Sequence, residues 1–164
     1  MKRFFGFIII ILLLTSTVFA ADVKVFSEKN KFGLQDAAGN QITPAQYSKL
    51  IRLGQTGWIA QKKSKYGLIN SSGDVLIPLK YRHVDRLTSK YVKFGNDNDF
   101  AVYDEFGKTI VQPQYSSVSM LFGGMFLTKK DYKYGIVDKH GRVILENKFD
   151  DIYMPKPNIM RIQY

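Results

Sequence analysis

The chain of 164 residues contains no cysteine and only two histidines. Without cysteine it can have no disulfide bond, no thiolate metal site, no cysteine nucleophile and no lipid attached through an N-terminal cysteine. Two histidines are a poor basis for a zinc hydrolase, because zinc sites need three or four ligands at short spacings. The hydrophobic content of 45% excludes a disordered chain. The length suits one domain or one short repeat array.

The N-terminal segment has the three-part layout of a secretory signal peptide. Lys2 and Arg3 precede an apolar run from Phe4 to Leu14 that only Gly6 interrupts, and residues 15–17 are polar. A spanning helix needs about 20 apolar residues, so the short run favours cleavage over an uncleaved anchor. We expect residues 1–20 to be removed, leaving a single repeat domain at 21–164. That domain has no second run of spanning length, and we expect a secreted or periplasmic protein without a membrane span.

The basic charge of the chain indicates an anionic partner. The formal net charge is +10, and it is spread through the sequence rather than gathered in one tail. Nucleic acid is a common partner of basic chains, but an exported protein does not meet it. A phospholipid headgroup, lipopolysaccharide or acidic polysaccharide of the cell envelope is the expected class.

Similar residues recur every 34 positions along the chain. The clearest columns hold glycine, an aromatic residue and an aliphatic residue: Gly39/Gly73/Gly107/Gly141, Tyr47/Tyr81/Tyr115/Phe149 and Leu50/Val84/Val118/Ile152. Further columns, such as Trp58/Val92/Phe126/Met160 and Phe32/Tyr66/Phe100/Tyr134, keep the same register without insertion. The sequence therefore consists of four repeats, which fill nearly all of residues 21–164.

Each repeat is expected to form a β-meander of three to four short strands. Residues 58–62 and 66–70 are rich in strand formers, and an Asp/Asn-x-x-Gly turn precedes a third strand near 74–77. We expect Pro44, Pro78 and Pro113 to end their strands at an edge or corner. The tail of each repeat suits either a fourth strand or one helical turn.

One meander buries too little apolar surface to be stable alone, so the repeats must share a core. We therefore predict an all-β fold, an array of four 34-residue β-meander repeats. An open twisted stack is preferred because blades of 34 residues would be thin. A small four-bladed propeller is the alternative.

The repeat resembles the WG-repeat family of bacterial proteins, also called KWG repeats. The second copy carries Lys65-Tyr66-Gly67, an Asn70-x-x-Gly73 turn, Pro78 and Tyr81. No copy has tryptophan before its glycine, the third has Asp99-Phe100-Ala101 instead, and the fourth lacks the proline. The resemblance covers residues 31–164 and implies a β-rich repeat protein. The family shares no catalytic residues.

The sequence offers little chemistry for catalysis, so we expect no enzyme activity, no cofactor and no metal. His83 and His140 lie in different columns, and the recurring Asp/Asn is explained by its turn. Glu105 and Glu146 carry no motif that would bring them to one cleft, as a glycosidase requires.

A charged ridge is the main candidate for partner binding. In-register stacking would align the hairpins at 28–31, 62–65, 96–99 and 130–133, the third of them acidic. The candidate lysines are Lys62, Lys63, Lys65, Lys129, Lys130 and Lys133. The alternative is a solvated edge whose charges prevent aggregation.

A second candidate is the apolar segment at 120–126. Its candidate contact residues are Met120, Phe122 and Met125, unless they fill the local core. The expected function is non-catalytic binding or scaffolding in the envelope or exterior, with an unknown protein or an anionic envelope component as partner. A secreted enzyme acting on polysaccharide and a purely structural unit are the alternatives.

Overall fold

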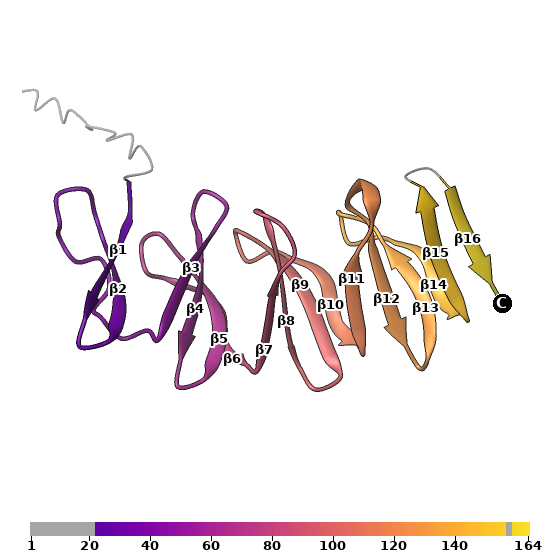
Figure 1. Ribbon diagram of the computed structural model, residues 1–164, viewed down its shortest axis with the longest axis horizontal. Coiled ribbons are helices and arrows are strands. Elements are labelled where there is room, and N and C mark those ends of the chain that lie inside the picture. Colours follow the sequence, from indigo (N-terminus) through magenta and orange to yellow (C-terminus); the bar gives the residue numbers. More distant parts are fainter. Residues whose placement is uncertain (1–21, 157–158) are drawn as a thin grey trace, which may run out of the picture.

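The computed structural model describes residues 22–156 and 159–164, and this part of the chain is almost entirely β-structure. Five antiparallel sheets follow one another in chain order along the long axis of the molecule (Figure 1). The sheets stand in a line and do not surround a central axis, which confirms the open stack and excludes the propeller. The predicted signal peptide at residues 1–20 lies outside the described residues.

We number the sheets 1 to 5 in chain order. Sheet 1 contains β1 (Lys24–Glu28) and β2 (Lys31–Gln35). Sheet 2 contains β3 (Lys49–Leu53), β4 (Gly57–Lys62), β5 (Lys65–Asn70) and β6 (Val75–Tyr81). Sheet 3 contains β7 (His83–Arg86), β8 (Tyr91–Asn96), β9 (Asp99–Asp104) and β10 (Thr109–Tyr115). Sheet 4 contains β11 (Ser117–Met120), β12 (Phe126–Lys130), β13 (Lys133–Val137) and β14 (Val143–Phe149), and sheet 5 contains β15 (Asp151–Lys156) and β16 (Ile159–Gln163).

The tail of each repeat is a strand and not a helical turn. β3 pairs with β4 from Lys49↔Gln61 to Leu53↔Gly57, so the end of one repeat joins the first hairpin of the next. The same pairing joins β7 to β8 and β11 to β12. A single residue separates each complete sheet from the following one. The structural unit is therefore a four-stranded meander that crosses the boundary between sequence repeats.

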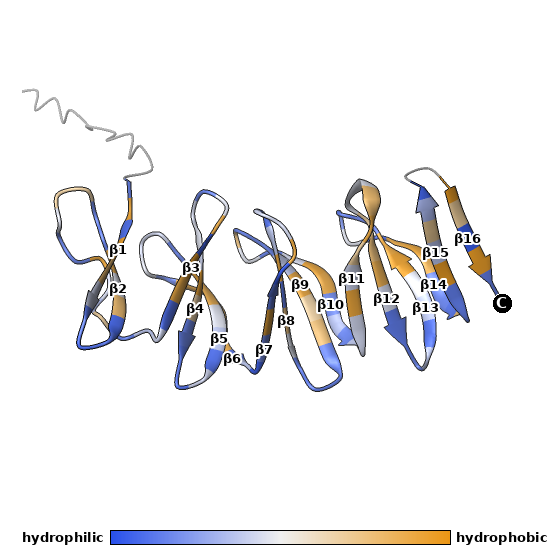
Figure 2. Ribbon diagram, in the orientation of Figure 1, coloured by the Kyte–Doolittle hydropathy of each residue, from blue (hydrophilic) through white to orange (hydrophobic). Residues whose placement is uncertain are grey.

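The core is divided among the spaces between neighbouring sheets. In the described residues it forms four clusters, each drawing side chains from two successive sheets, for example Leu68 and Phe94 between sheets 2 and 3. Strand β4 is buried on both faces, because Trp58 packs toward sheet 1 and Ile59 toward sheet 3. Figure 2 shows the hydrophobic residues along the strands and mainly hydrophilic turns at the lower edge. The predicted aromatic column is buried throughout, at Tyr47, Tyr81, Tyr115 and Phe149.

Strands β4, β8 and β12 each place two side chains on one face, and the sizes of these two side chains compensate each other. Sheet 2 places Trp58 beside the small Ala60, whereas sheet 4 places Phe126 beside Thr128. Sheet 3 reverses the order, with Val92 beside Phe94. Because side chains two residues apart share a face of a strand, each space receives one large and one small group. All six side chains are buried.

Pro78 and Pro113 do not end their strands, which corrects that part of the prediction, whereas their predicted position at an edge is confirmed. Pro44 lies outside the strands. Pro78 lies inside β6 and Pro113 inside β10, each on the outer strand of its sheet. Both strands shift register next to the proline, from Leu68↔Ile77 to Tyr66↔Tyr81 in sheet 2. Proline is tolerated at a bulge on an edge strand, because the ladder there requires no N–H donor.

Gly67, which follows Tyr66 in β5, makes a close backbone contact with β6. A Cβ atom on Gly67 would lie 2.5 Å from the carbonyl oxygen of Ile77 and 2.8 Å from that of Pro78. The bulged strand therefore approaches nearer than any side chain allows.

The Asp/Asn-x-x-Gly units form tight turns, as predicted. Asp104 Oδ1 accepts the N–H groups of Phe106 and Lys108 at 3.0 and 2.9 Å. Gly107, with φ of 82°, occupies the left-handed region that glycine adopts without strain. The equivalent turns at residues 70–73 and 138–141 have the same hydrogen bonds. In the described part of the chain, no helix reaches the length and apolarity needed to cross a membrane.

Candidate functional site

The hairpin turns of sheets 1 to 4 line up along the lower edge of the stack in Figure 1. We call this line the hairpin edge; its turns are residues 29–30, 63–64, 97–98 and 131–132. The third hairpin, at residues 96–99, is acidic and lies between the basic hairpins at 62–65 and 130–133, as in-register stacking predicted. The first hairpin, at 28–31, is basic like the second, so the sign of the charge changes only around sheet 3.

The turn residues themselves adopt a conformation that few side chains favour. Lys63 and Ser64 have φ of 49° and 60°, and Asp131 and Tyr132 have φ of 49° and 66°. Two-residue hairpin turns of this kind prefer Asn-Gly, because left-handed backbone costs other residues roughly 1–2 kcal/mol each. The hairpin edge therefore carries these side chains although the left-handed backbone of the turn disfavours them.

Three of the six candidate lysines are exposed on the hairpin edge: Lys62, Lys63 and Lys130. The Lys62 ammonium donates a hydrogen bond to Gln46, and Lys130 Nζ lies 3.3 Å from Gln114 Oε1. Sheets 2 and 4 thus repeat the same Lys–Gln contact. The amide orients the ammonium without neutralising its charge.

The other three candidate lysines are partly withdrawn from the edge. Lys65 and Lys133 are half-buried, and Lys133 Nζ forms an ion pair with Asp150 Oδ1 at 2.5 Å. Lys129 Nζ lies 4.8 Å from the centre of the Tyr134 ring, which packs toward sheet 5. The positive charge available to a partner therefore comes mainly from Lys62, Lys63 and Lys130.

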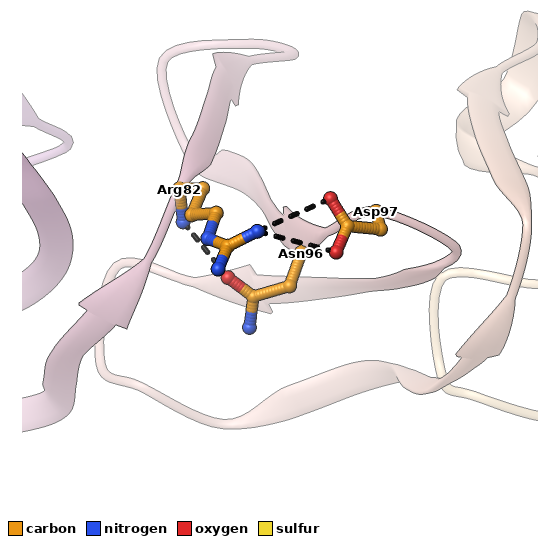
Figure 3. Close-up of polar contacts among 3 residues, drawn as sticks. All are labelled: Arg82, Asn96 and Asp97. Carbon is orange, nitrogen blue, oxygen red and sulfur yellow. Dashed lines mark hydrogen bonds and ion pairs between the residues drawn. The ribbon is translucent and has the colours of Figure 1, made fainter.

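The acidic turn of sheet 3 is tied to the preceding sheet (Figure 3). Arg82 Nη1 lies 3.3 Å from Asp97 Oδ2, and the Arg82 backbone N–H donates to Asn96 Oδ1 at 3.0 Å. Both charged side chains are well exposed, so the pair contributes little to stability. It does bridge the space between sheets 2 and 3 at the hairpin edge.

The equivalent space between sheets 3 and 4 is open and forms a groove of about 420 Å³. Its lining includes amides, hydroxyls, charged groups and one aromatic ring: Asn98, Gln114, Ser116, Lys130, Asp131 and Tyr132. Sequence reasoning found Lys130 but not the groove. The available signal was Ser116, which occupies the column of Arg82 and cannot form the bridge.

The apolar candidates divide between core and surface. Met120 and Met125 are half-buried and pack against the clusters on opposite sides of sheet 4, so both contribute to the core. Phe122 is 55% exposed in a short 3₁₀ turn between β11 and β12. It lines an apolar groove of about 530 Å³ together with Met120, Ile152 and Tyr153.

Glu105 makes a contact that the sequence did not indicate. This carboxylate, in the β9–β10 turn of sheet 3, is buried against the β3–β4 turn of sheet 2. Its Oε2 accepts the N–H groups of Gln55 at 2.5 Å and Thr56 at 3.4 Å. Glu105 is thus an inter-sheet clamp at the edge opposite the hairpin edge.

The Asp138 carboxylate, in the β13–β14 turn, has local structural partners. Burial alone would raise the pKa of Asp138, but the N–H groups of Arg142 and His140 and the Arg142 guanidinium lower it to about 2. Arg142 Nε lies 2.7 Å from Asp138 Oδ2. Within residues 22–156 and 159–164, no three His, Cys, Asp or Glu side chains gather as a metal site.

Sequence comparison identifies the repeat. The profile of the family described as "WG containing repeat" matches residues 66–97, 100–134 and 134–158. The first copy, at residues 31–65, lies outside the matched ranges. Neither the curated proteins nor the solved structures contain a significant match. Because the three matches cover more than half of the sequence, the chain belongs to the WG-repeat family.

Proposed function

We propose that this protein is an exported, non-catalytic binding module that contacts an anionic component of the cell envelope through its hairpin edge. The observation that supports this most directly is the exposure of Lys62, Lys63 and Lys130 along one edge of a rigid stack. Charges held by stacked sheets keep a fixed spacing, which favours a partner with repeated negative charges.

The turn geometry also supports a binding role for this edge. Lys63 is in left-handed backbone, where asparagine or glycine would be less strained. Strained positions that persist on a surface are typical of functional segments. A purely structural edge has no need of lysine at this position.

Export is the second part of the proposal, and it rests on the N-terminal segment. Cleavage after Ala20 would release a domain that begins at Ala21. N-terminal sequencing of the protein recovered from the periplasm or the medium tests this part. Recovery of an intact Met1 in the membrane fraction would contradict it.

The binding surface can be tested with two variants of equal charge. One carries Lys62→Gln, Lys63→Gln and Lys130→Gln on the hairpin edge. The control carries Lys90→Gln, Lys108→Gln and Lys139→Gln, three exposed lysines at turns on the opposite edge. Glutamine keeps the aliphatic stem and removes the charge, so neither variant should alter the fold.

The measurement is the salt concentration that elutes each protein from immobilised polygalacturonate. We expect the hairpin-edge variant to elute well below the wild type and the control to elute near it, since both variants lose three charges. Equal elution of the two variants would show that net charge alone causes retention. That result, or no retention of the wild type, would overturn the proposed binding edge.

A further inference from the structure

The groove between sheets 3 and 4 has the size and composition of a small-molecule site. Its volume of about 420 Å³ lies within the range of roughly 300–1,000 Å³ that such sites occupy. Two turns flank it, with Asn98 from sheet 3 on one side and Tyr132 from sheet 4 on the other. Gln114 and Ser116, from the end of β10 and the link between sheets, complete the lining.

The groove exists because one repeat lacks a bridge that its neighbour has. Between sheets 2 and 3, the ion pair of Arg82 with Asp97 spans the corresponding position (Figure 3). The residues 34 positions later are Ser116 and Asp131, which cannot form an ion pair with each other. The Ser116 hydroxyl donates instead to the Lys129 carbonyl oxygen at 3.2 Å. Among the described residues, no ion pair joins Asp131, so its carboxylate can accept from a ligand.

Tyr132 is an aromatic side chain without a structural role in the described fold. It is 88% exposed, and its backbone has φ of 66°. The same column holds Asn30, Ser64 and Asn98, which are small polar residues suited to a turn. Tyrosine at this position therefore strains the turn and exposes a large apolar ring. A ligand that packs on the ring would offset both costs.

The polar groups of the groove match hydroxyl groups better than a single strong charge. Asn98 presents both a donor and an acceptor to a sugar hydroxyl. The Gln114 amide accepts from Lys130 and donates to the Tyr115 hydroxyl, both at 3.3 Å, and a sugar hydroxyl can replace either of these long contacts. Lys130 and Asp131 have opposite charges, and the Lys129 ammonium lies over Tyr134. An isolated phosphate or sulfate would meet Lys130 and a Lys129 ammonium already placed over Tyr134, and the Asp131 carboxylate would oppose it.

We propose that this groove binds one saccharide unit of a glycan chain. The C–H face of a pyranose ring would pack on the negative face of the Tyr132 ring. Its hydroxyls would bond to the side-chain amides of Asn98 and Gln114 and to the Asp131 carboxylate, with Lys130 as a further donor. The inference deepens the proposed envelope-binding function and rests on it, since it names a polysaccharide as the partner.

The test is a titration of the ¹⁵N-labelled exported chain, followed by NMR, with two tetrasaccharides. Chitotetraose supplies uncharged pyranose rings and tetragalacturonate supplies acidic ones, so the two arms separate ring recognition from charge. We expect saturable shifts of the Asn98 and Gln114 side-chain NH₂ signals with at least one of them. Shifts with tetragalacturonate alone would make the Lys130 ammonium a carboxylate contact. No saturable shift with either would overturn the inference.

Two variants connect the binding to the groove. Tyr132→Asn introduces the residue that sheet 3 has in this column, and asparagine tolerates the left-handed turn, so the variant should fold. The control Phe106→Ser removes another exposed aromatic side chain, 66% exposed, from a turn on the opposite edge, and introduces the residue of its own column, Ser72. We expect Tyr132→Asn to weaken binding about tenfold or more and Phe106→Ser to leave it unchanged. Equal affinity of Tyr132→Asn and wild type would contradict the proposed site.

The outcome also separates this inference from the proposed function. Lysine-dependent retention on polygalacturonate without saccharide shifts would leave the charged edge in place and overturn the saccharide groove. Saccharide shifts without lysine-dependent retention would keep the groove and overturn the charged edge. The titration uses the wild type and the Tyr132 and Phe106 variants, which all keep Lys130, so its result does not depend on the lysine substitutions.

Discussion

Replacing Phe94 by alanine should strongly destabilise the stack, because this ring fills the space between sheets 2 and 3. Phe94 is fully buried, its ring stacks on Tyr81 with centroids 5.4 Å apart, and it lies 6.0 Å from the Tyr103 ring. The small neighbour Val92 cannot fill the vacated volume. Phe→Ala substitutions in such cores cost about 3–5 kcal/mol. We expect a loss of this size in the free energy of unfolding.

The matched control is Phe106→Ala, since that phenylalanine is 66% exposed in a turn of the same sheet. Urea unfolding followed by far-ultraviolet circular dichroism measures both variants. Phe106→Ala should change the free energy of unfolding by less than about 0.5 kcal/mol. A cost for Phe94→Ala of under about 1 kcal/mol, or equal costs for the two variants, would refute the claim that the space between sheets is a close-packed core.

Three further changes test other contacts of the stack. Glu105→Ala should cost about 1–3 kcal/mol in urea unfolding, because it leaves the N–H of Gln55 without its acceptor; an unchanged midpoint would contradict the clamp. Gly67→Ala should cost about 1–3 kcal/mol in the same assay, because its Cβ would lie 2.5 Å from a backbone oxygen; wild-type stability would contradict that approach. Asp138 has its pKa lowered to about 2, so its ionised form stabilises the fold above about pH 4, and this stabilisation is lost as the pH falls to 2. The difference in melting temperature between wild type and Asp138→Asn should therefore shrink from pH 5 to pH 2; a constant difference would contradict the ionised turn.

Much of the fold could be predicted because every repeat must meet the same packing and turn requirements. Tyr81 and its column recur at a fixed step, since every sheet must present an aromatic group to the next. Asp104 and Gly107 recur because the turn requires an acceptor and a left-handed residue. Pro78 was correctly predicted at a sheet edge, but the sequence does not say that its strand continues past the proline through a bulge.

Contacts that break the repeat could not be found from its columns. Phe94 and Val92 exchange sizes relative to the same positions in sheets 2 and 4, and a column read alone shows only a hydrophobic site. Glu105 shares its column with Ser71 and Lys139, so nothing in the pattern indicates a buried carboxylate. Such contacts depend on which side chains face each other across two sheets.

The alignment of the hairpins along one edge could be predicted from the 34-residue register of the repeats. The exposure of each side chain on that edge could not. Lys129 and Lys130 are neighbours in sequence, yet Lys130 is exposed, whereas Lys129 is half-buried and its ammonium lies over Tyr134. The groove at Tyr132 depends on the replacement of Arg82 by Ser116 one repeat later. A difference between copies was therefore the useful signal for the site, and the similarity between copies was the signal for the fold.

Residue-resolved amide hydrogen exchange on the whole chain tests most directly whether the sheets are stable only through their neighbours. Strands β4, β5, β8, β9, β12 and β13 lie in sheets covered on both sides, so they should exchange slowest. Protection should fall toward β1 and β16 in the terminal sheets. Protection as strong in β1 and β16 as in β8 would contradict the account, because it would mean that each sheet is stable without contact on both faces.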